Sequence, residues 1–150
     1  MLLSKNRKAL FNYQIVEKYM AGMVLHGYEV KAIREGNVNF EGSYIKLQNN
    51  EVFLVNLYIG KYSKQSKNKE ETDPKRIRKL ILNRKEIIEM EKEIAQKGKS
   101  AVPLALLLKN GMVKIEIATV KGKKEFEKKD TAKEKQIQKD LAIETKNYNR

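Results

Sequence analysis

The sequence predicts a mainly β domain with two or three short flanking helices and a basic C-terminal tail. Two turns, Asn49-Asn50 and Asn110-Gly111, each separate a pair of short apolar segments, as in antiparallel hairpins. Glycines and polar loops divide the segments before position 122, whereas residues 123–150 contain neither Gly nor Pro. We therefore expect one folded domain over residues 1–122 and a separate tail over residues 123–150.

The first quarter of the chain predicts an arm, a strand and a helix. Residues 1–12 form a basic arm with apolar ends, and the apolar, aromatic pattern of residues 13–25 predicts a strand. Gly22 interrupts this strand as a bulge would. Between two glycines, residues 28–35 predict a short helix whose apolar residues face inward. The polar residues left on its outer face are Glu29, Lys31 and Arg34.

The middle of the chain predicts a hairpin and a loop. Residues 43–48 and 51–59 are strands joined at Asn49-Asn50, because Asn tolerates the positive φ of a tight turn. The second strand is apolar on both faces and should be central and covered on both sides. Residues 61–79 hold 8 basic and 3 acidic side chains and predict a mobile loop.

A strand, a helix and a second hairpin follow. The strand at residues 80–82 precedes a helix that Asn83 caps, with Glu86 three residues on as in a capping box. The buried stripe of that helix is Ile87, Met90 and Ile94. Residues 102–109 and 112–120 form the hairpin. The face of its second strand that we expect to be exposed to solvent carries Lys114, Glu116 and Ala118. The pattern fits a closed antiparallel barrel of the oligonucleotide-binding type, which hides its sheet edges.

The charge of the chain predicts a polyanionic partner. The net charge is +13, of which residues 1–122 carry +10 and residues 123–150 carry +3. Such a surplus repels itself unless a polyanion neutralises it, and nucleic acids do so by releasing bound counterions. The alternative is a lysine-rich protein whose charge serves only solubility.

Other classes of function have little support. The chain has no Cys and a single His, His26, which excludes disulfides, thiolate metal sites and His-rich metal sites. No glycine-rich phosphate loop follows a strand, and His26 fits a structural role better than that of a hydrolase base. We expect no enzymatic activity, metal or cofactor. Since no apolar segment suits a signal peptide or spans a bilayer, we expect a cytoplasmic protein without membrane contact.

The tyrosines and the tail leave alternatives open. Tyr13, Tyr44 and Tyr62 either pack in the core or stack on bases. The tail is rich in Lys, Glu, Gln and Ala, but a single helix this polar is marginal in water. We expect a tail that is disordered when free and helical when bound, and the alternative is a tail that stays solvated.

Six stretches carry a family resemblance and keep their order and spacing over nearly the whole chain. They are Asn6-Arg7-Lys8-Ala9, Gly27-x-Glu29-Val30-Lys31-x-Ile33-Arg34-x-Gly36, Gly42-Ser43-Tyr44, Asp73-Pro74-x-Arg76-x-Arg78-Lys79-Leu80-x-Leu82, Val102-Pro103-Leu104 and Gly122-Lys123-Lys124. Each stretch alone is weak, and the six together are specific. The chain resembles the small protein B family, the tmRNA-binding (SsrA-binding) proteins of bacterial trans-translation.

The resemblance implies a closed barrel that holds the tRNA-like domain of tmRNA and takes it to the A site of a stalled 70S ribosome. The tail is then expected to fold as a helix in the decoding centre and the empty mRNA channel. Further implied partners are the 16S rRNA decoding region and elongation factor Tu, through aminoacylated tmRNA. Implied RNA-binding residues are Asn6, Arg7, Lys8, Tyr13, Glu29, Lys31, Arg34, Tyr44, Arg76, Arg78 and Lys79. Implied tail residues are Gly122, Lys123, Lys124, Phe126, Glu127, Lys128, Lys129, Lys133, Lys135 and Ile137.

Three positions depart from the family's pattern. Met20 stands where the family usually has an acid that takes part in RNA binding. Glu127-Lys128-Lys129 replaces Asp-Lys-Arg, which keeps the charge signs but loses a guanidinium group, and Phe126 replaces a His or Tyr. The alternative function is that of a general RNA chaperone or ribosome-associated RNA-binding module with the same barrel.

Overall fold

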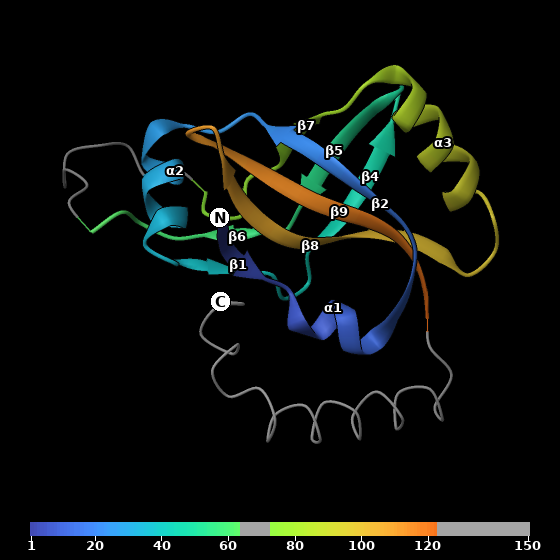
Figure 1. The fold of residues 1–150 in the computed structure, drawn as a ribbon, viewed down its shortest axis with the longest axis horizontal. Coiled ribbons are helices and arrows are strands. Elements are labelled where there is room, and N and C mark those ends of the chain that lie inside the picture. The colour runs from blue at the N-terminus through green and yellow to red at the C-terminus, as the bar shows by residue number, and fades with distance from the viewer. Residues whose placement is uncertain (64–72, 123–150) are drawn as a thin grey trace.

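The computed structural model describes residues 1–63 and 73–122 and is mainly β, with three short helices as predicted (Figure 1). In chain order the elements are β1 (Leu2–Lys5), α1 (Arg7–Asn12), β2 (Tyr13–Met23), α2 (Gly27–Arg34), β3 (Val38–Asn39), β4 (Tyr44–Gln48), β5 (Glu51–Val55), β6 (Tyr58–Ile59), β7 (Arg78–Ile81), α3 (Arg84–Ile94), β8 (Lys99–Lys109) and β9 (Met112–Gly122). The predicted tail and the centre of the predicted mobile loop lie outside the described residues.

Seven strands form one antiparallel sheet in the order β1-β8-β9-β2-β7-β5-β4, and β3 pairs with β6 in a separate two-stranded sheet. β4 comes near β8, but no backbone ladder joins them in the described part of the chain. The predicted closure of the barrel is therefore not found there. The edge of β8 away from β9 pairs with β1 at Ala105–Leu107, and next to this ladder the backbone and side-chain amides of Asn6 donate to the carbonyls of Leu104 and Pro103 at 2.7 and 2.8 Å. These stretches of the β8 edge therefore bind β1 and the turn into α1, and not β4.

Both predicted hairpin turns are confirmed. Asn49 and Asn50 have φ values of 53° and 63° between β4 and β5, and Asn110 and Gly111 have 52° and 75° between β8 and β9. Two successive residues with positive φ match the right-handed twist of the strands they join. The turns thereby set the register of both hairpins, Gln48↔Glu51 and Lys109↔Met112.

The N-terminal residues are more ordered than the predicted basic arm. They form β1, which extends the sheet at β8, and α1, which lies at the bottom of the view in Figure 1. Ala9 of α1 belongs to a small apolar cluster with Val102, Leu104, Ala118 and Val120. Ala118 is therefore fully buried, and the prediction that it lies on a solvent-exposed face is wrong.

Two strand predictions also need correction. Residues 51–59 are two strands rather than one, because Asn56 has a φ of 63° and turns the chain from β5 into β6. β5 still lies inside the sheet, between β4 and β7, as predicted. The bulge of β2 falls between Ile15 and Glu17, whereas Gly22 is regularly paired with Ile81 and Lys114. A Cβ at Gly22 would lie 3.4 Å from that of Ile81, so the glycine permits close pairing with β7.

The predicted capping box of α3 is confirmed. The Asn83 side chain accepts from the Glu86 amide at 2.8 Å, and the Glu86 carboxylate accepts from the Asn83 amide at 3.4 Å. Met90 is fully buried, and Ile87 and Ile94 pack partly buried against the main core. The expected apolar stripe therefore places α3 on the sheet.

A polar group also ties α3 to the sheet. The Tyr19 hydroxyl donates to one oxygen of Glu93 at 2.9 Å, and the Thr119 hydroxyl donates to the other. Burial, and then the hydrogen bond and charge of Glu93, raise the pKa of Tyr19 above its ordinary value. The hydroxyl consequently stays protonated and remains a donor.

Gly111→Ala should destabilise the protein, because a φ of 75° is strained for any residue with a Cβ. We expect urea unfolding to show a loss of about 1 kcal/mol. Gly27→Ala is the control, since no atom lies within 4 Å of the added Cβ at the start of α2. That change should stabilise the protein by about 0.5 kcal/mol. Equal effects of the two changes would contradict the turn geometry.

Candidate nucleic-acid interface

A buried ion cluster joins α2 to β7. Glu29 of α2 is 2% exposed, and Arg78, the first residue of β7, is fully buried. Arg78 donates from Nε and Nη2 to Glu29 Oε2 at 3.0 and 2.7 Å. Arg76 donates from Nε to the same oxygen at 3.2 Å and from Nη2 to Oε1. One carboxylate therefore binds two guanidinium groups.

The backbone satisfies the rest of this cluster. The His26 amide donates to Glu29 Oε1 at 2.9 Å, and Arg76 donates to the Val24 carbonyl at 3.3 Å. Arg78 donates to the carbonyls of Leu57 and Pro74. Among the described residues, no buried side-chain nitrogen or oxygen lacks a partner. Full pairing is what makes buried charges tolerable, because an unpaired one costs several kcal/mol.

The outward position predicted for Glu29 is therefore wrong, because its side chain is buried. Arg78 is a buried member of this cluster, and its contact with phosphate stays a prediction. All three nitrogens of the Arg78 guanidinium donate within the protein. Arg76 is partly exposed, but its guanidinium group also forms an ion pair with Glu29. These residues hold α2 and β7 together, whereas Lys31 and Arg34 of α2 are exposed as predicted.

The charge state of Glu29 follows from its neighbours. Burial alone would raise the pKa of its carboxyl group, but hydrogen bonds from Arg76, the His26 amide and Arg78 outweigh burial. The pKa of Glu29 is therefore lowered below its ordinary value. The carboxylate stays charged at neutral pH and keeps both arginines in place.

Asn6 is also structural. Its side-chain oxygen accepts from the Ala9 amide at 3.3 Å and caps α1, while its nitrogen donates to Pro103 at 2.8 Å. Both ends of the amide are used, and the residue is buried. In this structure the Asn6 side chain therefore positions its neighbours, Arg7 and Lys8, and its contact with RNA stays a prediction.

Five predicted RNA-binding residues, the buried Asn6 among them, line one hollow of about 790 Å³. Arg7 and Lys8 come from α1, Tyr13 from the start of β2 and Tyr44 from β4. The hollow lies at the seam where β4 and β8 do not pair, with residues of both strands in its wall. Further polar lining residues are Ser4, Lys5, Asn12, Asn39 and Ser43. Cations, aromatic rings and amides on one concave surface suit a nucleotide.

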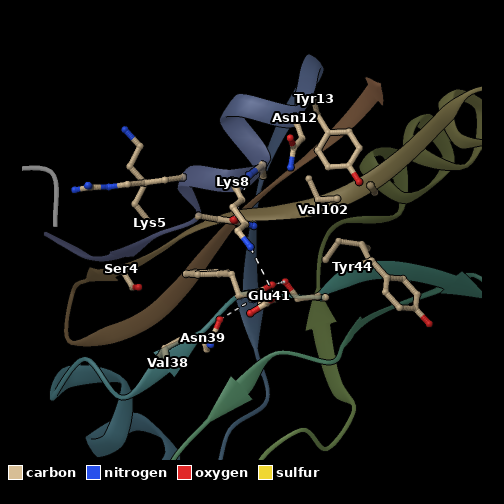
Figure 2. A pocket seen from close by; sticks show the side chains of 18 of the residues that line it. Ser4, Lys5, Lys8, Asn12, Tyr13, Val38, Asn39, Glu41, Tyr44 and Val102 are labelled. Atoms are coloured by element: carbon tan, nitrogen blue, oxygen red, sulfur yellow. Dashed lines mark hydrogen bonds and ion pairs between the residues drawn. The ribbon is translucent and has the colours of Figure 1, made fainter. Parts of the chain in front are cut away.

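An acidic residue that the sequence analysis did not select lies in this hollow. Figure 2 shows Glu41 facing Lys8 across it, and 3.6 Å separate Glu41 Oε1 from Lys8 Nζ. The Glu41 amide donates to the Asn39 side chain at 2.9 Å, which shapes the turn before β4. The sequence contains the turn signal, Gly42 with a φ of 76°, but only the fold brings this turn to α1.

The other predicted cations lie outside the hollow. The Lys31 ammonium lies 5.2 Å from the ring centre of Tyr62, a cation–π contact at the α2 surface. Lys79 on β7 pairs with Glu51 on β5 at 3.6 Å. The cationic surface therefore has several separate parts, and the hollow is the part where two predicted cations, Arg7 and Lys8, meet two predicted tyrosines.

The contacts of His26 fit the structural role predicted for it. The His26 ring stacks on Tyr28 with centroids 5.4 Å apart, and the His26 amide binds Glu29. Within residues 1–63 and 73–122, no group of three potential ligands is placed to hold a metal ion. No described helix combines the length and apolarity needed to cross a membrane.

Met20, where the family usually has an acid, lies on an apolar surface. Its side chain is exposed, as are those of Ile81 and Met112, and all three line one shallow hollow. Glu86 of α3 also lines it. This chain therefore presents methyl and thioether groups there, beside the carboxylate of Glu86 and the ammonium groups of Lys109 and Lys114.

The profile of the family described as SmpB protein matches residues 3–147. The chain belongs to the SmpB family. The SsrA-binding protein of Persephonella marina is 43% identical over 141 residues, which are 94% of this chain and 91% of the relative. That of Geotalea uraniireducens is 43% identical over 149 residues, which are 99% and 97% of the two chains. The family resemblance stated from the sequence is confirmed.

A solved structure supports the same assignment. It is described as "tmRNA-SmpB: a journey to the center of the bacterial ribosome". Its similar chain has a TM-score of 0.70 and 38% identity, and the match covers 83% of this chain and 87% of that one. The fold described above is thus shared with a solved SmpB structure.

Glu29→Gln should strongly destabilise this SmpB-family protein, because it removes the counter-charge of the buried Arg78. We expect urea unfolding to show a loss of about 3–5 kcal/mol. The control is Glu51→Gln, which breaks an exposed ion pair and should cost less than about 1 kcal/mol. Similar losses in the two variants would show that the Glu29 cluster does not hold the SmpB fold together.

Stability should also fall in acid. A carboxyl whose folded pKa is depressed contributes stability above its unfolded pKa, about 4.3 for Glu, and loses it as the pH falls through the folded pKa. Thermal midpoints measured from about pH 7 to pH 3 should therefore decline below about pH 4.5. Glu29→Gln should flatten this decline, and parallel curves for the two proteins would argue against the lowered pKa.

Proposed function

We propose that this protein binds tmRNA and takes part in trans-translation, the rescue of stalled ribosomes, in the cytoplasm. The observation that carries the proposal is its membership of the SmpB family, whose relatives named SsrA-binding protein match 94–99% of the chain at 43% identity. The protein acts by binding, and makes or breaks no bond.

The folded body, residues 1–122, is proposed to hold the tRNA-like domain of tmRNA and deliver it to the ribosomal A site. Support comes from the hollow at the seam, where Arg7 and Lys8 meet Tyr13 and Tyr44. Basic side chains that replace counterions on phosphates favour any RNA, and a shaped concave surface selects among RNA folds. The exposed residues Lys31, Arg34 and Lys79 extend the cationic surface.

The tail, residues 123–150, is proposed to become helical in the decoding centre and the empty mRNA channel. Its composition supports this, as does the family match that extends to residue 147. Further support is that Gly122, the last described residue, is paired with Tyr13, which lines the hollow proposed to bind RNA. The further partners in this proposal are the 16S rRNA decoding region and elongation factor Tu, through aminoacylated tmRNA.

A chain that ends at Gly122 tests the division of labour. It should bind a transcript of the tRNA-like domain within about three-fold of the full chain, because the tail carries only +3 of the net charge of +13. In a reconstituted translation system it should not support peptide tagging. Its thermal unfolding is compared with that of the full chain as a folding control. Tagging by the shortened chain would overturn the proposed role of the tail.

Competition between two RNAs for the protein measures its selectivity for the tRNA-like fold. The tRNA-like transcript should bind at least about ten-fold more tightly than an unstructured RNA of equal length, since shape is recognised in addition to charge. Fluorescence anisotropy at several salt concentrations separates the two contributions. Equal affinity for the two RNAs would instead support the general RNA chaperone.

A further inference from the structure

The centre of the hollow is occupied by an ion pair. In Figure 2, Lys5 lies at one end and Tyr13 and Tyr44 at the other, with Lys8 and Glu41 facing each other between them. The pair bridges α1 and the turn before β4, and thus spans the seam that no backbone ladder closes. Whatever enters the hollow meets this pair.

The ion pair between Lys8 and Glu41 is weak enough to separate when a ligand binds. Its side chains are 75% and 71% exposed, and 3.6 Å between nitrogen and oxygen is longer than a good hydrogen bond. Water and salt therefore screen the attraction, and such pairs contribute little to stability. The Glu41 backbone is better fixed than the Lys8 side chain, because its amide binds Asn39 and the next residue, Gly42, adopts the positive φ of the turn. Lys8 is the flexible partner.

We propose that Glu41 is an internal competitor for RNA phosphate, which occupies Lys8 until a nucleotide enters the hollow. The inference rests on the proposed function and names the group of the RNA that this site receives. A phosphate oxygen takes the place of the Glu41 carboxylate beside Lys8, with Arg7 as a second cation in the lining. The base extends toward Tyr13 and Tyr44, which line the same hollow, because aromatic rings are the groups on which bases stack.

The Glu41 carboxylate should lower the affinity of the protein for RNA. A lysine that is paired with a carboxylate of the protein must lose that attraction before it binds a phosphate, and the carboxylate then repels the phosphate, so the contact gains less than that of a free lysine. Removing the charge of Glu41 should therefore strengthen RNA binding. A residue that served RNA by accepting hydrogen bonds from bases or ribose would show the opposite sign.

The test is a double-mutant cycle in the full chain, with a transcript of the tRNA-like domain of tmRNA as the probe. Glu41→Gln should tighten binding about three- to ten-fold at low salt, and Lys8→Gln should weaken it. In the Lys8→Gln background, Glu41→Gln should lose most of its effect. The slope of log K against log salt should become shallower by about 0.9 in Lys8→Gln, which loses one phosphate contact, and should stay near the parent value in Glu41→Gln.

Glu116→Gln is the matched control. It removes the same charge from a partly exposed ion pair, Lys18–Glu116 at 4.0 Å, which lies outside the hollow and contains no predicted RNA contact. It should change affinity less than about two-fold and leave the salt slope unaltered, because only the long-range field changes. Unfolding midpoints of all variants confirm that each chain is folded.

The outcomes separate the two proposals. If the parent protein binds the transcript but Glu41→Gln behaves like Glu116→Gln, or weakens binding, the competitor role is refuted and the proposed function stands. The same holds if Glu41→Gln acts equally with and without Lys8. If the parent protein fails to bind the transcript at all, both proposals fall.

Discussion

The rest of this structure depends on the pairing of one buried carboxylate with two arginines. β7 is the strand that connects β2 to β5, and so joins one half of the sheet, β1-β8-β9-β2, to the other, β5-β4. Arg78 begins that strand and is anchored to Glu29 of α2. Because a buried charge without its partner is strongly unfavourable, the pair specifies where β7 and α2 lie relative to each other. Arg76 adds a second, partly exposed bond to the same carboxylate.

This arrangement separates the cations that build the fold from those that are free for a ligand. The seam between β4 and β8 is bridged by side chains rather than by a backbone ladder. Side chains can exchange partners without unfolding the sheet, whereas a ladder cannot. The unpaired seam thus provides the hollow, and the short helix α1, capped by Asn6, supplies its basic wall.

Local chemistry explains what the sequence could predict. Asn49-Asn50, Asn110-Gly111 and the Asn83–Glu86 capping box act within a few residues, and the structure confirms all three. The partners of Glu29 lie 47 and 49 positions away, and no periodicity in α2 reveals them. A charged residue on a short amphipathic helix is ordinarily exposed, which is why the prediction failed. The sequence could not predict the open seam between β4 and β8 either. The contacts along the edge of β8 include the bond from Asn6 to Pro103, and these residues are 97 positions apart. Glu29 and Arg78 both belong to the stretches that carry the family resemblance, so a motif can mark a residue of the framework as well as one of the interface.

Chemical modification of the arginines by a dicarbonyl reagent, followed by mass spectrometry, tests this separation most directly. It is carried out on the folded full chain with and without the tRNA-like transcript. We expect Arg7 to react in the free protein and to be protected by the RNA, and Arg78 to be unreactive in both states because its guanidinium is buried. If Arg78 reacts as fast as Arg7 and is shielded only when RNA is bound, its guanidinium faces the ligand and the account of a buried framework is contradicted.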